Sequence, residues 1–369
     1  MNKNIAILTF HDAINYGAFL QCFALNKIIS DLNYNVKVLN YKNKFFQTGY
    51  SQRILNKKTS KEKILQIYHW VVKPIYTFNL VLKNHKFKKC QKKYLKLSKL
   101  YFKNNIKNSN DEFDTFIVGS DQVWNYRISG FDDTYFLNFV KDNNTRISYA
   151  ASIGKKYLTG EEYYLLKENL PKFKAISVRE KSTVIEIKDK LNYDVRVVLD
   201  PTLLLGRDEW LKITPNFNKK KKYIFIYLVQ TPTYLLNVAF DYAKKNNLQV
   251  YSFSKLRTKN KYKLFVNKSP IDFLNFINSA EKIFTTSYHG ILFSINFHKD
   301  FYYELSTAKI NMNERIEDIM KNFKIEGREI NSTNQELVTS AIDYKFVDEV
   351  LEVERDVSKK FLIDAIGGK

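Results

Sequence analysis

The chain has 369 residues, 44% of them hydrophobic and 15% aromatic, which is enough apolar material for two buried cores and excludes a disordered protein. No apolar run reaches about 18 residues and no signal-peptide pattern opens the chain, so we expect neither a membrane-spanning nor an exported protein. Sixty basic against thirty-eight acidic residues leave a net charge of +22, which would attract nucleic acid, anionic lipid or phosphorylated substrates, unless it only reflects a lysine- and asparagine-rich genome.

The cysteine count and the absent motifs narrow the classes further. Cys22 and Cys90 are too few for a disulfide framework or a zinc site, so we expect reduced thiols in a cytoplasmic protein. The sequence has no G-x-G-x-x-G, P-loop, C-x-x-C or H-E-x-x-H motif, which argues against nicotinamide chemistry, nucleotide-driven phosphoryl transfer and structural zinc. No nucleic-acid-binding module is visible, and we expect no nucleic-acid partner.

The first half of the chain alternates β-type runs with helical periodicity. IAILTF (5–10), the helical pattern after it and NVKVLNY (35–41) predict a parallel strand–helix–strand unit. Its connecting loop HDAINYG would lie at the carboxyl end of the first strand, where open α/β sheets bind ligands. Four later segments each begin with a β-type run and end in small or polar residues: FDTFIVGSDQVWN (113–125), RISYAAS (146–152), KAISVRE (174–180) and VRVVLDPTLLL (195–205).

A lysine-rich stretch interrupts this series. Residues 51–107 have a helical pattern, with leucine and aromatic residues among the lysines. Such a helix either packs its apolar stripe on its own domain and exposes the lysines to water, or rests on anionic lipid. Both interpretations stay open.

The second half repeats the αβ alternation. The polar, lysine-laden segment 206–222 has no periodicity and predicts a domain boundary. YIFIYLV (223–229) then begins a second series, and NERIEDIMKNFK (313–324) predicts an amphipathic helix. Between them the patterns predict a helix near 234–246, a strand at 248–254, a helix at 270–280, a strand at 281–287, a helix at 288–299 and a strand at 300–305.

The best candidate for chemistry is KIFTTSYHGILFSINFHK (282–299), a strand followed by a turn that opens a helix. The N-terminus of a helix binds anions, and Gly290 permits a close approach of the backbone. His289 adds an imidazole that titrates near neutral pH. The alternative is a capped helix whose histidine only packs at the boundary. His11, at the end of the first strand, is a weaker candidate.

Two other strand ends carry suitable groups. Arg179 ends KAISVRE and would bind a carboxylate or phosphate, or else pair with Glu180. Asp121 in GSDQVWN would orient sugar hydroxyls or act as a base, or else cap the next helix. Trp124 offers a ring that stacks on a sugar face.

Six of these segments, in this order, resemble the polysaccharide pyruvyl transferase family from residue 5 to about residue 328. The resemblance implies two Rossmann-like domains facing across a cleft, a glycosyltransferase-B-like architecture, at residues 1–212 and 220–335. The lysine-rich segment 51–107 would be an insertion, and 336–369 a helical segment that packs back on the first domain. The six segments are ILTFHDAINYGAFLQCFAL, FIVGSDQVWN, SYAASIG, ISVRE, VLDPTLLL and TTSYHGILFSINFHKDF.

The resemblance also implies an activity: transfer of pyruvate from phosphoenolpyruvate to a sugar of a bacterial capsule or exopolysaccharide, as a ketal. Carried over by motif, Arg179 and His289 contact phosphoenolpyruvate, with Gly290 beside them. Ser287 stands where the family motif R-x-H-G has arginine, so another cation should compensate. Arg315 ranks first for this role, before Lys309 and Arg328.

The same interpretation predicts that four residues bind the acceptor: Asn15, Tyr16, Asp121 and Trp124. It implies no metal and no bound cofactor, with phosphoenolpyruvate as co-substrate and an acceptor that is a glycan or its lipid-pyrophosphate-linked precursor. One alternative is a glycosyltransferase that uses a nucleotide sugar on the same scaffold. Another is a glycan-assembly binding protein that contacts an anionic membrane, at the inner face, through the lysine-rich helix.

Overall fold

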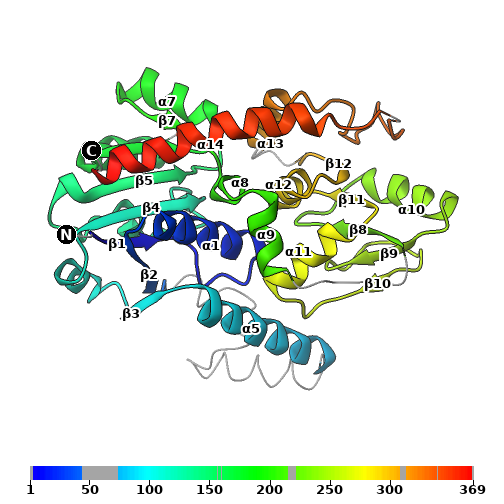
Figure 1. The fold of residues 1–369 in the computed structure, drawn as a ribbon, viewed down its shortest axis with the longest axis horizontal. Coiled ribbons are helices and arrows are strands. Elements are labelled where there is room, and N and C mark those ends of the chain that lie inside the picture. The colour runs from blue at the N-terminus through cyan, green and yellow to red at the C-terminus, as the bar shows by residue number, and fades with distance from the viewer. Residues whose placement is uncertain are drawn as a thin grey trace. The chain divides into compact units, whose positions relative to one another are not determined.

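The computed structural model describes residues 3–43, 74–155, 157–158, 160–214, 222–307, 313–338 and 340–367. The chain divides into two compact units: unit 1 contains Met1–Leu204 and Val357–Lys369, and unit 2 contains Leu205–Asp356. A parallel β-sheet lies at the centre of each unit, as Figure 1 shows. The unit bounds differ from the predicted domains 1–212 and 220–335, because the helix at 207–213 belongs to unit 2 and the end of the last helix to unit 1.

In the described part of unit 1, seven parallel strands form a sheet in the order β3-β2-β1-β4-β5-β6-β7. Its inner strands are buried on both faces, as expected of a sheet that helices cover on both sides. The strands are β1 (Asn4–Leu8), β2 (Asn35–Tyr41), β3 (Leu97–Tyr101), β4 (Thr115–Asp121), β5 (Arg146–Ala151), β6 (Ala175–Val178) and β7 (Arg196–Val197).

The helices of unit 1 follow these strands in turn. Helix α1 is buried along most of its length, and the Asn15 side chain caps its start by accepting from the backbone N–H of Ala18. The helices are α1 (Tyr16–Asp31), α5 (Pro74–Tyr94), α6 (Glu161–Asn169), α7 (Lys181–Leu191) and α8 (Pro201–Leu204), with short 3₁₀ turns η1 (Ile106–Asp111), η2 (Asp133–Phe136), η3 (Asn143–Thr145) and η4 (Leu170–Lys172).

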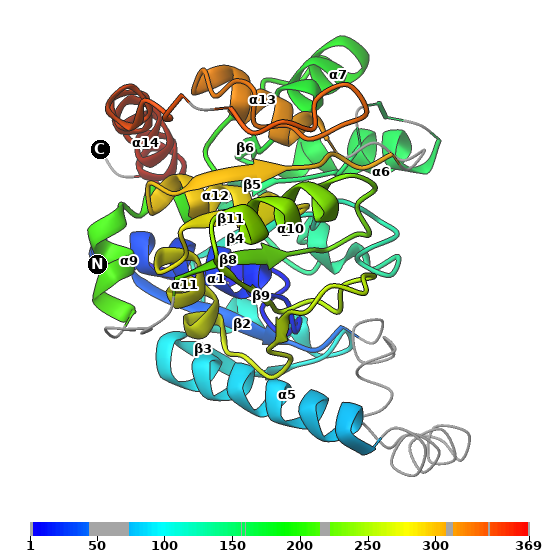
Figure 2. The ribbon, with the colours of Figure 1, turned by 90° about the vertical axis from the view of Figure 1, so that its right-hand side faces the viewer.

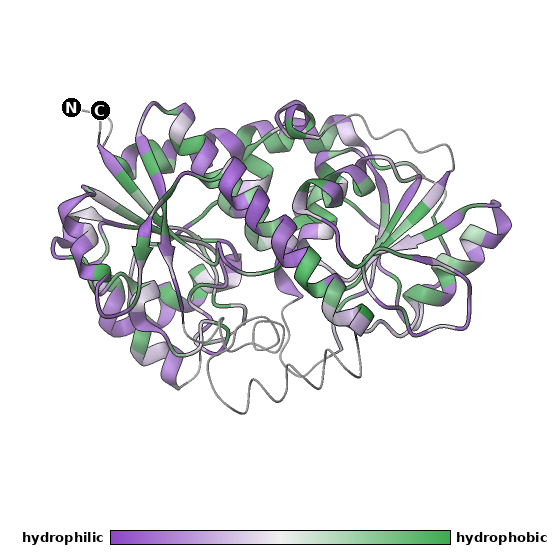
Figure 3. Ribbon diagram, turned by 90° about the horizontal axis from the view of Figure 1, so that it is seen from below, coloured by the Kyte–Doolittle hydropathy of each residue, from purple (hydrophilic) through white to green (hydrophobic). Residues whose placement is uncertain are grey.

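The described part of unit 2 has five parallel strands in the order β10-β9-β8-β11-β12. Helix α10 buries its apolar side and exposes hydrophilic residues, whereas α11 is buried along most of its length. Figure 3 shows hydrophobic and hydrophilic residues along the helices of the chain. The elements are α9 (Arg207–Ile213), β8 (Tyr223–Tyr227), α10 (Leu235–Lys245), β9 (Gln249–Ser252), β10 (Lys263–Leu264), α11 (Pro270–Asn278), β11 (Lys282–Thr285), α12 (Tyr288–Asn296), β12 (Asp300–Tyr303), α13 (Glu314–Asn322) and α14 (Tyr344–Ile366).

Both sheets reverse their strand order beside their first strand. In unit 1 the order runs outward from β1 to β2 and β3 on one side, and to β4 on the other; unit 2 does the same from β8. Connections on the two sides of such a point leave in opposite directions, and the carboxyl ends of the two strands therefore border a crevice where ligands bind. The loops after β1 and β4, and those after β8 and β11, are the places to look for a site.

The predicted α/β class with parallel sheets is confirmed, and three details are corrected. Within the stretch predicted as helical (51–107), β3 is a strand that pairs with β2 at the sheet edge; residues 51–73 lie outside the described part. The predicted irregular boundary contains α9, because Trp210 is fully buried against Phe293, with ring centroids 4.9 Å apart. The short edge strand β10 was not predicted.

The last helix, α14, begins in unit 2 and ends in unit 1. In unit 1 the Ser358 hydroxyl accepts from the backbone N–H of Leu199 (3.0 Å), and the side chains of Leu362 and Ile366 are buried. No helix among the described residues is long and apolar enough to cross a bilayer.

We expect the end of α14 to contribute directly to the stability of the protein. Leu362 is fully buried whereas its neighbour Ile363 is 36% exposed. Leu362→Ala should lower the free energy of unfolding by about 2–5 kcal/mol through lost burial and a cavity. The matched change Ile363→Ala should cost less than about 1 kcal/mol. Urea denaturation followed by fluorescence compares the two, and equal midpoints would contradict this packing.

Candidate active site

The turn between β11 and α12 is built from side-chain hydroxyl groups at the reversal point of unit 2. The Thr285 hydroxyl donates to the Tyr227 carbonyl at the end of β8 (2.6 Å) and accepts from the backbone N–H of Ser287 (3.0 Å). The Ser287 hydroxyl then caps α12 by accepting from the backbone N–H of Gly290 (3.3 Å). One short chain of hydrogen bonds thus ties the start of α12 to the end of β8.

Position 290 has no room for a side chain, so this turn requires glycine. A Cβ atom on Gly290 would lie 2.5 Å from the Thr285 hydroxyl oxygen and 3.3 Å from the Ser287 Cβ. The absence of a side chain therefore lets α12 begin directly against the strand end, which agrees with the close backbone approach that the sequence predicts.

The structure brings a cation to the same helix start. The Arg315 guanidinium of α13 lies over the ring of Tyr288, 4.7 Å from its centroid. The Tyr288 ring in turn contacts the half-buried His289 ring edge to face, at 5.3 Å between centroids. Since α12 has no acidic residue in its first turn, the imidazole, the guanidinium and the helix dipole together favour an anion here.

The other two cations that the sequence offered in place of the family arginine behave differently. Arg328 is buried and bonds to Asp300, the Tyr302 hydroxyl and the Ser340 carbonyl. Since Asp300 begins β12, the guanidinium of this arginine is held toward the amino end of the strand, away from the end that carries His289. Lys309 lies outside the described residues.

A second helix start in unit 2 is already occupied by a protein carboxylate. Glu304, which directly follows β12, is buried and accepts from the backbone N–H groups of Thr233, Tyr234 and Leu235 at the start of α10. The dipole of α10 is thus neutralised internally. The start of α12 differs, because it is capped by the uncharged Ser287 and its first turn has no acidic residue.

A cavity that was not predicted from the sequence borders the turn between β11 and α12. It measures about 210 Å³ and lies at the carboxyl ends of β8 and β9, with the exposed side chains of Lys255 and Arg257 in its wall. The Thr286 hydroxyl accepts from the backbone N–H groups of two lining residues, Val229 and Gln230 (3.0 and 3.3 Å). The sequence does contain a sign of this cavity, because two cations, Lys255 and Arg257, come just after the predicted strand 248–254.

In unit 1 the reversal point joins the loop after β1 to the end of β4. The Thr9 hydroxyl donates to the Ser120 carbonyl (2.9 Å), which links the two strand ends. Asn15 is exposed with its side-chain oxygen already capping α1, whereas Tyr16 is buried. The half-buried Asp121 lies at the end of β4 with φ of 79°, and its carboxylate accepts from the backbone N–H of Gln122 (2.8 Å).

The structure distinguishes between the alternatives that the sequence left open for Asp121 at the end of β4. The residues after Asp121 form turns, so Asp121 does not cap a helix there. Trp124 is buried, stacks on Phe136 at 5.9 Å and donates its indole N–H to the Tyr135 carbonyl (3.3 Å). Its ring is used for core packing, and we leave Trp124 out of the proposed acceptor site.

Arg179 forms the ion pair with Glu180 that the sequence offered as an alternative to ligand binding, and a second ion pair with Asp200. Its Nε lies 3.4 Å from Glu180 and its Nη1 3.1 Å from Asp200, and all three side chains are almost completely buried. The Thr202 N–H and hydroxyl hold the Asp200 carboxylate at 3.0 and 2.7 Å. The guanidinium is therefore fixed in one orientation between two carboxylates.

The imidazole of His11 is buried at the reversal point of unit 1. Its Nδ1 lies 3.4 Å from the Thr9 carbonyl, and its Nε2 has no hydrogen-bond partner among the described residues. Burial lowers the pKa of His11 below its usual value of about 6.5, and the nearby Lys42 acts in the same direction, whereas Asp12 opposes both.

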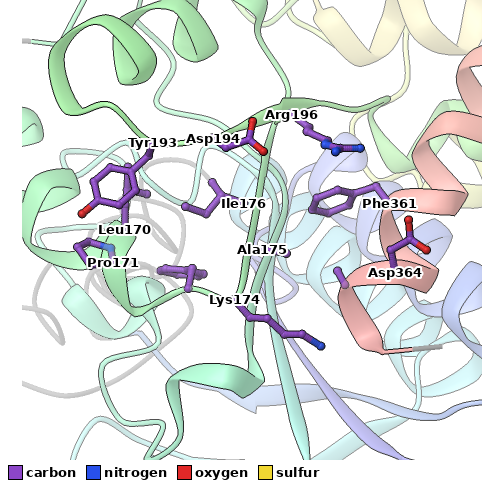
Figure 4. A pocket seen from close by; sticks show the side chains of 12 residues that line it. Leu170, Pro171, Lys174, Ala175, Ile176, Tyr193, Asp194, Arg196, Phe361 and Asp364 are labelled. Carbon is purple, nitrogen blue, oxygen red and sulfur yellow. The ribbon is translucent and has the colours of Figure 1, made fainter. Parts of the chain in front are cut away.

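A larger cavity of unit 1 lies away from these loops. It measures about 450 Å³ and opens at the amino ends of β6 and β7, beside the end of α14. Figure 4 shows charged side chains of both signs around it, among them Lys174, Asp194, Arg196 and Asp364, with Phe361 between. Because it lies at the opposite edge of the sheet, it is no part of the candidate site. No cluster of metal-binding side chains occurs in the described ranges.

Comparison with known proteins gives one family and one fold. A family model described as "Polysaccharide pyruvyl transferase" matches residues 15–303. A putative UDP-N-acetylglucosamine 2-epimerase from Listeria monocytogenes aligns with 99% of this chain and 91% of its own at 10% identity and a TM-score of 0.51. Another UDP-N-acetylglucosamine 2-epimerase covers 98% and 96% at 11% identity, also with 0.51. These likenesses show a glycosyltransferase-B-type α/β fold. No curated protein matches the chain.

The tight contact at Gly290 should make even a methyl group costly. Gly290→Ala is expected to lower the free energy of unfolding of unit 2 by about 1–3 kcal/mol, because Thr285 and Ser287 must move. Gly206→Ala is the control, since a Cβ there meets nothing within 4 Å. Thermal unfolding of both variants provides the comparison, and an unchanged melting temperature for Gly290→Ala would disprove the crowding.

The buried His11 should make stability fall in acid. Its folded-state pKa is lowered, so protonation favours the unfolded chain, and its contribution is complete above about pH 6.5 and declines as the pH falls below that value. Between pH 6.5 and 5.5 the loss is at most about 1.4 kcal/mol. Urea denaturation at both pH values should show a smaller loss of unfolding free energy for His11→Gln than for the wild type. For the exposed His85→Gln this loss should equal that of the wild type.

Proposed function

The chain belongs to the polysaccharide pyruvyl transferase family, and on that premise we propose that it transfers pyruvate from phosphoenolpyruvate to a sugar as a ketal. The acceptor would be a residue of a bacterial capsule or exopolysaccharide, or its lipid-linked precursor. As proposed, phosphoenolpyruvate is the co-substrate and no resident cofactor takes part. The observation that carries the proposal is Arg315, whose guanidinium lies over the ring of Tyr288, the residue next to His289 at the start of α12.

This arrangement supports an anionic donor in spite of Ser287. The family motif has arginine at this position, and its loss removes one strong contact to a carboxylate or phosphate. Arg315 comes from another helix but reaches the residue directly after Ser287. Since Glu304 neutralises the start of α10, the start of α12 is the better place in unit 2 for the donor.

The proposed reaction has three steps. A proton adds to the methylene carbon of phosphoenolpyruvate and makes C2 strongly electrophilic. A sugar hydroxyl adds to C2 and loses its proton, and the C2–O bond to phosphate then breaks. A second hydroxyl of the same sugar adds and loses its proton, which closes the ketal and leaves inorganic phosphate. The protein must supply an acid, a base and cations.

We assign these roles by chemistry. His289 moves the proton, because an imidazole can both give and take a proton. Arg315 and the dipole of α12 hold the negative charge of the donor. In unit 1, Asp121 and Asn15 orient the acceptor from the loops at the reversal point. Arg179 is kept as a donor contact on the family resemblance, with Glu180 and Asp200 fixing its orientation.

A nucleotide-sugar transferase is the alternative. The similar structures are named as enzymes of a nucleotide sugar, but at 10–11% identity this likeness extends only to the fold. The two functions differ in the ligand that the purified protein binds. Calorimetry with phosphoenolpyruvate and with UDP-N-acetylglucosamine, each measured against inorganic phosphate, therefore distinguishes them.

Two substitutions test the assigned roles. With phosphoenolpyruvate and a panel of glycan acceptors, His289→Ala should reduce phosphate release by about 10²- to 10⁴-fold, as expected for loss of a general acid or base. Arg315→Ala should mainly weaken phosphoenolpyruvate binding, by about 10- to 100-fold, because a hydrogen bond to a charged group is lost. Arg315→Lys should recover part of this affinity.

The control is His85→Ala, which removes an exposed histidine from α5. Its activity should equal that of the wild type. Full activity of His289→Ala would refute the role given to this residue. Binding of UDP-N-acetylglucosamine without binding of phosphoenolpyruvate would replace the proposed function with the alternative.

A further inference from the structure

Helix α5 (Pro74–Tyr94) carries an unusual share of the positive charge of the chain. It contains six lysines and no acidic residue. None of these lysines forms an ion pair with a carboxylate in the part of the chain that the structure describes. In Figures 1 and 2 the helix lies at the margin of unit 1, with β3 following it.

One side of α5 packs on the loop that follows β1. The Gln91 side chain donates to the His11 carbonyl (2.8 Å), and the Phe87 ring lies 5.3 Å from the Tyr16 ring. Lys83 is the one lysine of the helix that turns inward, with its ammonium group 4.6 Å from the centroid of Tyr16. These contacts fix the rotation of the helix about its own axis.

The opposite side is exposed and divided along its length. Near the N-terminus it presents large apolar side chains, with Ile75 77% exposed, Phe78 55% and Val81 37%. The C-terminal half presents four exposed lysines. Positions three or four residues apart share one side of a helix. We call this side the outward face of α5, defined by Ile75, Phe78, Val81, Lys88, Lys89, Lys92 and Lys93.

We infer that the outward face of α5 docks on the surface of a lipid bilayer that contains anionic lipid. Exposed apolar side chains at one end of a helix can enter the boundary of the acyl chains, and lysines at the other end meet lipid phosphates. The two contributions add, since apolar burial acts at short range while the lysines are attracted across about a Debye length.

Charge selects the bilayer over a second copy of the protein. Two outward faces brought together would oppose four lysines to four lysines, in a chain whose net charge is already +22. An anionic bilayer instead neutralises these charges and buries the apolar end at once. Because α5 also contacts His11 in the loop after β1 and Tyr16 at the start of α1, docking would place the proposed acceptor side of unit 1 near a lipid-borne substrate.

Vesicle binding of the full chain tests this inference without any substrate, so its outcome is independent of the proposed function. Sedimentation with phosphatidylglycerol-containing vesicles at low salt should show binding that pure phosphatidylcholine vesicles lack. A basic residue near the membrane contributes about a fivefold change in affinity. Replacing Lys88, Lys89, Lys92 and Lys93 by glutamine should therefore weaken binding by at least about a hundredfold.

The controls separate the helix from the overall charge. Replacing four exposed lysines of unit 2, Lys244, Lys245, Lys259 and Lys261, by glutamine removes the same charge and should change binding by less than about fivefold. Ile75→Gln with Phe78→Gln should remove the binding that persists at high salt. Circular dichroism establishes that each variant is folded.

Three results would overturn the inference. The first is no binding of the wild type to anionic vesicles at low salt. The second is an equal loss of binding in the unit 2 variant and in the α5 variant. The third is dimerisation that increases with protein concentration and requires Ile75 and Phe78, in a protein that does not bind vesicles. A second copy of the chain would then be the occupant of the outward face.

Discussion

The candidate site depends on one hydrogen bond, from the hydroxyl of Thr285 to the carbonyl of Tyr227. It joins β11 to β8 at the point where the sheet of unit 2 reverses its order, and the same hydroxyl accepts the N–H of Ser287. The position at which α12 begins follows from these two bonds. Gly290 fits because the space beside Thr285 is too small for a side chain.

The placement of charge then decides which strand end receives an anion. A carboxylate of the protein already occupies the start of α10, where Glu304 accepts from three backbone N–H groups. At the start of α12 the protein instead places the uncharged Ser287, the imidazole of His289 and the guanidinium of Arg315. The helix dipole and the guanidinium both favour a negatively charged ligand there.

Helix α5 brings part of the basic composition of the chain close to the proposed acceptor side of unit 1. Its inward side supports the loop after β1 through Gln91 and Phe87, and its outward face concentrates lysines without acidic neighbours. This one helix holds six of the 60 basic residues and lies next to one of the two reversal points.

The sequence by itself determined the α/β class, the alternation of strands and helices, and the turn of His289 and Gly290, because these follow from periodicity and from residues next to each other in the chain. It also matched the family, although it misread α9 and β3, whose structure depends on partners: Phe293 for Trp210, and β2 for the edge strand. Only the tertiary structure decided that Arg315 contacts Tyr288, that the Arg328 guanidinium is directed to Asp300 and that Trp124 is part of the core. Each of these depends on contacts between distant segments, which local patterns do not encode.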